Sequence, residues 1–179
     1  MTPTATARVA TALAGLVVAG SLYLSMGMGL AACPLCYYQR TFVMGAFAVL
    51  LVGSIGGAET KVSLPGLALP LTLAGLWLGT WHVRLELAGK MECPAGIFAV
   101  GTAPQQALVA QALLVAFLLA GALRGELPGS GWLSAGVSLI LAVVLAVACV
   151  ASAAPPPKPP LKDYEVPPAM CRPLPKPEA

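Results

Sequence analysis

Charged side chains are scarce in this chain. Asp, Glu, Lys and Arg make up 9% of its 179 residues, while hydrophobic residues make up 58%. Soluble globular chains carry about 25% charge, so the composition excludes an ordinary soluble domain. The net charge is only +3, and no block of Lys and Arg alternates with aromatic residues. A nucleic-acid partner is therefore also excluded, because the basic footprint that binds phosphates is missing.

Long uncharged runs take up most of the chain. A bilayer span needs about 20 mostly apolar residues. Five runs approach or exceed that length, and they cover residues 9–32, 41–58, 62–83, 103–123 and 129–154. We therefore predict an all-α integral membrane protein with five transmembrane helices.

Proline is concentrated at the C-terminal end. Ten of residues 155–179 are Pro, a composition that favours an extended polyproline II chain rising about 3.1 Å per residue. The 17 residues from Ala154 to Cys171 then span on the order of 50 Å, which brings Cys171 over any point of one membrane face. We divide the chain into a transmembrane domain, residues 1–154, and a Pro-rich extracytoplasmic tail, residues 155–179.

Four of the five cysteines lie outside these runs, and the fifth, Cys149, is expected to be a small apolar filler. Four cysteines allow three pairings, and the sequence leaves the choice open. Lys and Arg are shared too evenly among the loops to decide the orientation. With a cytoplasmic N-terminus, all four outer cysteines fall on the outer face, where disulfides persist. We predict this orientation for Cys33, Cys36, Cys93 and Cys171.

Cys33 and Cys36 form a C-x-x-C motif between the first two runs. Pro34 is a favoured first helical residue, so Cys36 would lie in the first turn of a helix, where the partial positive charge stabilises a thiolate. Arg40 follows four residues later on the same helical face and would lower the pKa of Cys36 further. We interpret Cys36 as a thiolate placed beside an electron acceptor.

A zinc site is an alternative interpretation of this motif. Structural zinc prefers four ligands, but the chain has no second C-x-x-C, and its only histidine, His82, is 46 residues from Cys36. The positive charge of Arg40 would also oppose a cation. The sequence therefore predicts no metal.

A lipid anchor is a second alternative, because Leu-Ala-Ala-Cys at residues 30–33 resembles a bacterial lipobox. Cleavage there would remove residues 1–32. The preceding apolar run is longer than a typical signal core of about 7–15 residues, and further spans follow it. We therefore favour a retained first helix.

Two motifs resemble the disulfide bond formation protein B (DsbB) family. The first is Cys-Pro-Leu-Cys-Tyr-Tyr-Gln-Arg at residues 33–40, placed between a first and a second span. The second is Trp-His-Val-Arg-Leu-Glu at residues 81–86, at the end of the third run, with Cys93 in the loop that follows. The resemblance covers roughly residues 8–124.

The resemblance implies a four-helix membrane bundle, to which this chain adds a fifth transmembrane helix. It implies a monomeric thiol:quinone oxidoreductase of the bacterial cytoplasmic (inner) membrane. Such an enzyme reoxidises a thioredoxin-like (DsbA-like) disulfide donor outside the membrane and passes electrons to the membrane quinone pool, ubiquinone or menaquinone. Carried over, Cys36 interacts with the quinone and Arg40 stabilises it, while Cys33 exchanges with a second cysteine pair. The residues expected near the quinone ring are His82, Tyr37 and Trp81.

The chain departs from the family pattern in its second cysteine pair. The family places that pair wholly in the loop between spans three and four, where this chain has only Cys93. Our hypothesis is that Cys171 of the tail replaces the missing partner, and that the donor attacks Cys93. Two other functions stay open: a quinone-linked reductase of the vitamin K epoxide reductase type, in which the C-x-x-C comes late in the bundle, and a non-enzymatic membrane scaffold.

Overall fold

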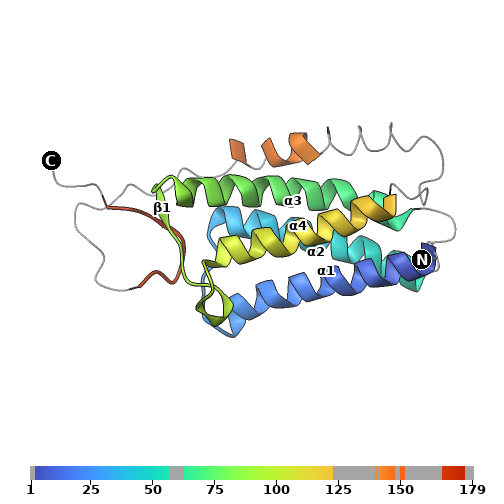
Figure 1. Ribbon diagram of the computed structural model, residues 1–179, viewed down its shortest axis with the longest axis horizontal. Coiled ribbons are helices and arrows are strands. Elements are labelled where there is room, and N and C mark those ends of the chain that lie inside the picture. Colours follow the sequence, from blue (N-terminus) through green and yellow to red (C-terminus); the bar gives the residue numbers. More distant parts are fainter. Residues whose placement is uncertain are drawn as a thin grey trace.

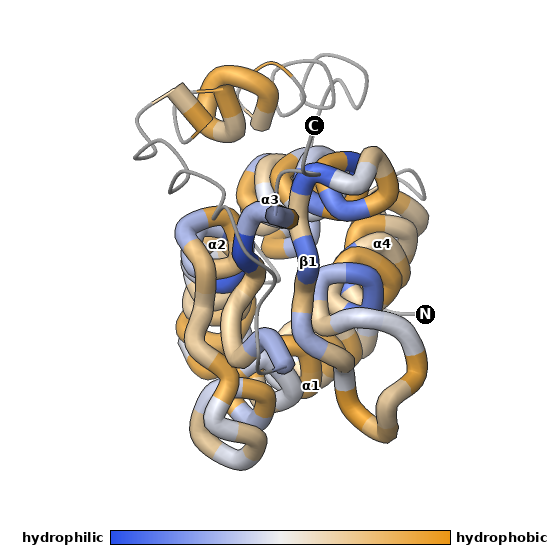
Figure 2. Tube along the Cα trace, turned by 90° about the vertical axis from the view of Figure 1, so that its left-hand side faces the viewer, coloured by the Kyte–Doolittle hydropathy of each residue, from blue (hydrophilic) through white to orange (hydrophobic). Residues whose placement is uncertain are grey.

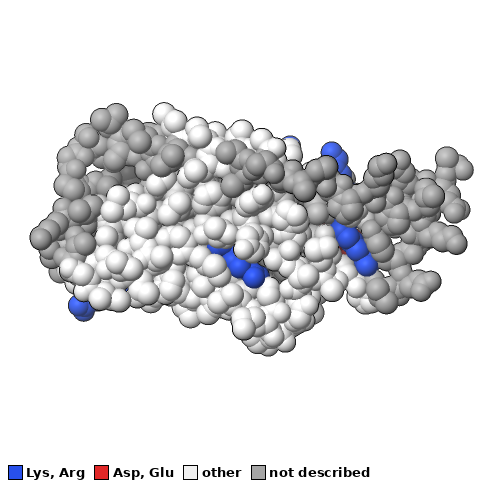
Figure 3. Space-filling model, turned by 180° about the vertical axis from the view of Figure 1, so that it is seen from behind, with Lys and Arg blue, Asp and Glu red and all other residues white. Residues whose placement is uncertain are grey.

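The computed structural model describes residues 3–56, 63–122, 140, 142–147, 150, 151 and 167–175. Within them, four long helices lie side by side: α1 (Pro3–Met26), α2 (Pro34–Ile55), α3 (Leu64–Leu87) and α4 (Ala103–Gly121) (Figure 1). Each is long and apolar enough to cross a membrane. The described surface seen in Figure 3 is mostly uncharged, with few Lys and Arg side chains. The prediction of an all-α membrane bundle is confirmed.

A fifth helix lies within the predicted run 129–154. Residues 140, 142–147, 150 and 151 are helical, whereas the bounds of this helix, Cys149 and the domain boundary at residue 154 lie outside the described residues. α4 ends at the end of the bundle where the N-terminus lies, and residues 172–173 lie at the other end (Figure 1).

The ends of the helices depart from the ends of the apolar runs. α1 stops at Met26 although the apolar run reaches residue 32, because Gly27 follows and Gly29 adopts a left-handed backbone with φ +68°. α2 begins at Pro34, before its apolar run, since Cys33 caps the helix and its sulfur accepts a hydrogen bond from the backbone N–H of Cys36 at 3.3 Å. The motif residues thus belong to the helix.

Small residues let the helices approach closely. Ala7, Ala10 and Ala14 of α1 are fully or almost fully buried and face Ala46 and Leu50 of α2 in one apolar cluster. The other buried members of this cluster come from α3 and α4: Leu64, Ala68, Leu69, Leu114 and Leu118. Because α1 supplies part of this core, cleavage at a lipobox before Cys33 would remove a packed helix of the bundle.

The tail is bound to the end of the bundle where α2 begins. β1 (Met91–Glu92) pairs antiparallel with β2 (Arg172–Pro173), and Arg172 forms a 3.1 Å ion pair with Glu92. The backbone N–H of Ala31 donates to the carbonyl of Ala169 at 2.9 Å. Figure 2 views this end and shows hydrophilic residues around β1, with mostly hydrophobic helices behind. A short 3-10 helix, η2 (Ile97–Ala99), lies between β1 and α4.

Candidate redox site

Four cysteines meet at this end of the bundle. Cys33 precedes α2 and Cys36 lies in its first turn, while Cys93 follows β1 and Cys171 precedes β2. Cys93 and Cys171 form a disulfide across 78 residues of sequence, in agreement with the pairing hypothesis. Both are buried, with 8% and 7% of their surface exposed.

The disulfide lies directly against the C-x-x-C. The thiols of Cys33 and Cys36 are free, and a 3.1 Å hydrogen bond joins their sulfurs. The sulfurs of Cys33, Cys36 and Cys171 and a ring nitrogen of His82 all lie within 4.8 Å of one another. Two cysteine pairs from opposite parts of the chain are therefore close enough to exchange a disulfide after a small movement.

His82 of α3 lies between the two pairs. Its side chain is fully buried. Its Nε2 atom is 3.8 Å from the sulfur of Cys33 and 3.6 Å from that of Cys93, while its Nδ1 atom is 3.8 Å from the sulfur of Cys36. One imidazole thus contacts sulfurs from both pairs, where it can accept or return a proton during exchange.

The ionised sulfur is Cys33. The hydrogen bond with Cys36 lowers the pKa of Cys33 to about 4 from an ordinary value of 9.0, and the contact and charge of His82 and the backbone N–H of Cys36 act in the same direction against the effect of burial. The sequence placed the thiolate on Cys36. The structure gives the low pKa to Cys33 instead, chiefly because of the side-chain hydrogen bond with Cys36. The backbone N–H of Cys36, which the sulfur accepts at the N-cap position, contributes less.

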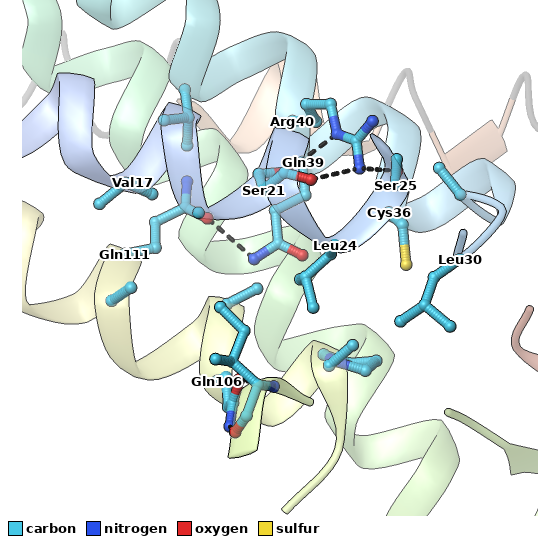
Figure 4. A pocket seen from close by; sticks show the side chains of 18 of the residues that line it. Val17, Ser21, Leu24, Ser25, Leu30, Cys36, Gln39, Arg40, Gln106 and Gln111 are labelled. Atoms are coloured by element: carbon cyan, nitrogen blue, oxygen red, sulfur yellow. Dashed lines mark hydrogen bonds between the residues drawn. The ribbon is translucent and has the colours of Figure 1, made fainter. Parts of the chain in front are cut away.

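Arg40 is turned toward α1. Its Nε donates to the hydroxyl of Ser21 at 2.9 Å, and its Nη2 donates to the carbonyl of Ser21 at 2.9 Å and to the hydroxyl of Ser25 at 2.7 Å (Figure 4). Within the described residues, Nη1 has no hydrogen-bond partner. The guanidinium therefore links α2 to α1 and keeps one donor group free.

A cavity of about 310 Å³ opens beside Cys36 and Arg40. It lies among α1, α2, α4 and the segment after Cys93, and its walls are mainly aliphatic (Figure 4). Cys171 also lines it. The cavity is therefore lined by one cysteine of each pair. Its aliphatic lining includes Leu16, Val17, Leu24, Leu30, Val43 and Ile97.

Two buried amides, Gln39 and Gln111, form part of the polar wall of the cavity. Nε2 of Gln39 donates to Oε1 of Gln111 at 2.9 Å, and Nε2 of Gln111 donates to the carbonyl of Thr72 at 3.2 Å. These residues were not among the predicted site residues. The signal that points to Gln111 is an amide inside an uncharged run, because a buried polar group in a membrane requires a partner.

Three residues expected near a quinone do not line this cavity. His82 is enclosed among the sulfurs instead. Tyr37 and Trp81 are 62% and 41% exposed on the outside of the bundle, because each is one residue, about 100° of helical rotation, from an inward-facing neighbour. Contact between these three side chains and a quinone stays a prediction that this cavity does not support.

A multi-pass membrane bundle with two cysteine pairs in contact at one end defines a class of membrane thiol–disulfide proteins. The family model described as "Disulfide bond formation protein DsbB" matches residues 3–155. The chain belongs to the DsbB family.

The chain is also similar to individual curated proteins. It is 28% identical over 89 residues to a "Probable disulfide formation protein" of Chlamydia trachomatis, with 45% of this chain and 64% of that protein covered. It is 34% identical over 77 residues to a "Disulfide bond formation protein B" of Ralstonia nicotianae, with 43% and 48% covered. The chain thus spans between about half and two thirds of these relatives. No solved structure matches.

Proposed function

We propose that the protein is a thiol:quinone oxidoreductase that reoxidises a thioredoxin-like partner outside the membrane. The observation that carries this proposal is the contact between the Cys93–Cys171 disulfide and the C-x-x-C at a cavity that also holds Arg40. The cysteine end of the bundle faces the oxidising exterior, where disulfides persist. The N-terminus, at the other end (Figure 1), is then cytoplasmic in a bacterial inner membrane.

The first step is exchange with the partner. A thiolate of the reduced partner attacks the Cys93–Cys171 bond and forms a mixed disulfide, and the partner's second thiol displaces it. The partner leaves with a disulfide, and Cys93 and Cys171 keep the two electrons and two protons as thiols. Because both sulfurs are buried, the β2 segment has to move aside when the partner docks. We favour Cys93 as the attacked sulfur, since Cys171 lines the cavity on the inner side.

The second step moves the electrons inside the protein. The Cys93 and Cys171 thiols reduce a Cys33–Cys36 disulfide through a mixed disulfide and regenerate their own bond. Cys33 is the sulfur that meets the second pair, because Cys33 and Cys93 both contact Nε2 of His82. His82 takes the proton from the attacking thiol and returns it to the departing sulfur. The thiols of Cys33 and Cys36 are the reduced product of this step.

The cavity fits a quinone. Its volume of about 310 Å³ lies at the lower end of the range for small-molecule sites, about 300–1,000 Å³, and its aliphatic walls suit a lipid-soluble ring. Arg40 lines it, and its Nη1, which has no hydrogen-bond partner in the described part of the chain, suits a carbonyl acceptor. A bound quinone would supply the two-electron acceptor chemistry. Cys36 faces this site. With a quinone bound there, Cys33 and Cys36 would close their disulfide by giving up two electrons and the remaining thiol proton to the quinone.

A quinone-reduction assay tests this function. Purified protein receives a reduced thioredoxin-like dithiol and either ubiquinone or menaquinone, and quinone absorbance is followed without oxygen. We expect one quinone to be reduced per partner disulfide formed, and we expect Cys171→Ser to stop partner oxidation because Cys93 loses its partner. A protein that consumes no quinone while its cysteines stay intact would be a scaffold.

A further inference from the structure

We propose that the fully reduced protein binds one thiophilic metal ion, Zn²⁺ or Cu⁺, through Cys33, Cys36, Cys171 and His82. In the folded chain these four residues, drawn from three separate regions of the sequence, place one ligand atom each within 4.8 Å of the others. Three thiolates and one imidazole form a Cys₃His ligand set, which is common in closed zinc sites. The site depends on the cysteines and His82, not on a quinone.

The spacing of the ligand atoms approaches that of a tetrahedral site. Zn–S bonds of about 2.3 Å and Zn–N bonds of about 2.0 Å place neighbouring ligand atoms about 3.5–3.8 Å apart. Here the sulfur of Cys33 lies 3.8 Å from Nε2 of His82, the sulfur of Cys36 lies 3.8 Å from Nδ1, and the two sulfurs lie 3.1 Å from each other. An ion bound through one ring nitrogen therefore requires a small rotation of the imidazole. Shifts of about an ångström, within rotamer adjustment of the side chains, close the site around an ion.

The structure removes one objection to a metal that the sequence raised and weakens the other. His82, remote in sequence, contacts both sulfurs of the C-x-x-C. Arg40 directs its guanidinium to the oxygens of Ser21 and Ser25 on α1. The cluster is also sheltered from water, since Cys33, Cys171 and His82 are buried. Access is available through the cavity, which is lined by Cys36 and Cys171.

The redox state of the second pair controls the site. In the disulfide form Cys171 is bonded to Cys93, and a disulfide sulfur is a poor ligand compared with a thiolate. Reduction of this bond consumes two electrons and two protons and frees the Cys171 thiol. Metal binding then transfers no electrons: each thiol ligand loses its proton as its metal–sulfur bond forms. A bound ion occupies the sulfurs that exchange disulfides, and it therefore holds the reduced protein inactive.

Direct metal spectroscopy of the unmodified chain is the first test. Metal-free, full-length protein in detergent is reduced with a phosphine without oxygen and titrated with Co²⁺, whose visible absorption reports tetrahedral thiolate ligation. We expect one Co²⁺ per chain, displaced by Zn²⁺. X-ray absorption of the Zn²⁺ form should give three sulfurs at about 2.3 Å and one nitrogen at about 2.0 Å. No uptake, or a shell with fewer than three sulfurs, overturns the site.

Two matched variants test the redox control. Cys93→Ser and Cys171→Ser remove the same disulfide, so any loss of stability is shared, but only Cys93→Ser keeps the Cys171 thiol. We expect Cys93→Ser to bind Zn²⁺ as tightly as the reduced parent without reduction of a second pair. Cys171→Ser, and the parent with its disulfide intact, lack the Cys171 ligand. Each should bind Zn²⁺ at least about tenfold more weakly than the reduced parent. Equal affinities for the two variants overturn the assignment of Cys171.

Discussion

Nε2 of His82 lies 3.6 Å from the sulfur of Cys93. The same nitrogen is 3.8 Å from the sulfur of Cys33, so one proton acceptor serves both cysteine pairs. His82→Ala should therefore slow the internal disulfide exchange about 10²–10⁴-fold, the usual contribution of a positioned acid or base. Rapid acid quenching followed by thiol alkylation measures this rate.

A matched measurement separates this role from quinone binding. Because His82 does not line the cavity, the KM for quinone should stay within about twofold in His82→Ala. His82→Gln keeps a hydrogen-bonding side chain but cannot titrate, and it should be as slow as His82→Ala. An unchanged exchange rate together with a raised KM for quinone would contradict this role.

The low pKa of Cys33 predicts a pH dependence. With a folded-state pKa of about 4 against an ordinary 9.0, Cys33 is ionised at neutral pH, and its stabilisation of the fold is complete above about pH 9 and is lost as the pH falls through 4. The reduced C-x-x-C should lose one thiolate absorbance with a midpoint near pH 4. Cys36→Ala removes the hydrogen bond that lowers the pKa of Cys33 most, so the midpoint should move to higher pH. An unchanged midpoint would contradict the stated cause.

Arg40 should support both quinone affinity and the α1–α2 contact. Arg40→Ala removes three hydrogen bonds to Ser21 and Ser25, and hydrogen bonds to charged groups contribute about 1.5–3 kcal/mol each. We expect a lower Tm in detergent and a KM for quinone raised about tenfold or more. Ser25→Ala is the control, because it removes one of these bonds and leaves Nη1 in place; it should lower the Tm less and leave the KM nearly unchanged.

Gly75 should be intolerant of a side chain. A Cβ at Gly75 would collide with the side-chain amide of Gln111 and displace it from Gln39 and Thr72. Overpacking of this kind costs about 1–3 kcal/mol, so Gly75→Ala should lower the Tm. Gly20→Ala on α1 is the control, since a Cβ there meets no atom within 4 Å, and it should keep or raise the Tm. Equal changes in Tm for Gly75→Ala and Gly20→Ala would contradict a stabilising role for the amide network.

The sequence predicts the positions of the helices well because they depend on local features. Hydrophobic runs determine where spans lie, and Pro34 after Cys33 predicts the start of α2. The cysteine spacing alone leaves three pairings open; the Cys93–Cys171 hypothesis comes from the family resemblance, supported by the membrane side and the reach of the tail, and the structure agrees with it.

The contacts within the site could not be predicted in the same way. The helices are apolar on nearly every face, so periodicity does not show how α2, α3 and α4 rotate against one another. That rotation is what places His82 among the sulfurs and Gln39 against Gln111. The pairing of β1 with β2 involves two residues in each strand, too few for an alternating pattern. Arg40 was placed on the correct face, but its serine partners on α1 depend on tertiary packing.

Disulfide mapping of the full-length protein, with and without quinone, tests the central claim most directly. The oxidised protein is mixed with a reduced thioredoxin-like dithiol, quenched in acid, alkylated and analysed by mass spectrometry. Without quinone, we predict that Cys33 and Cys36 become reduced first while Cys93–Cys171 is regenerated, and that added quinone restores the Cys33–Cys36 bond. Accumulation of free Cys93 and Cys171 beside an intact Cys33–Cys36 disulfide, unaffected by quinone, would contradict the account.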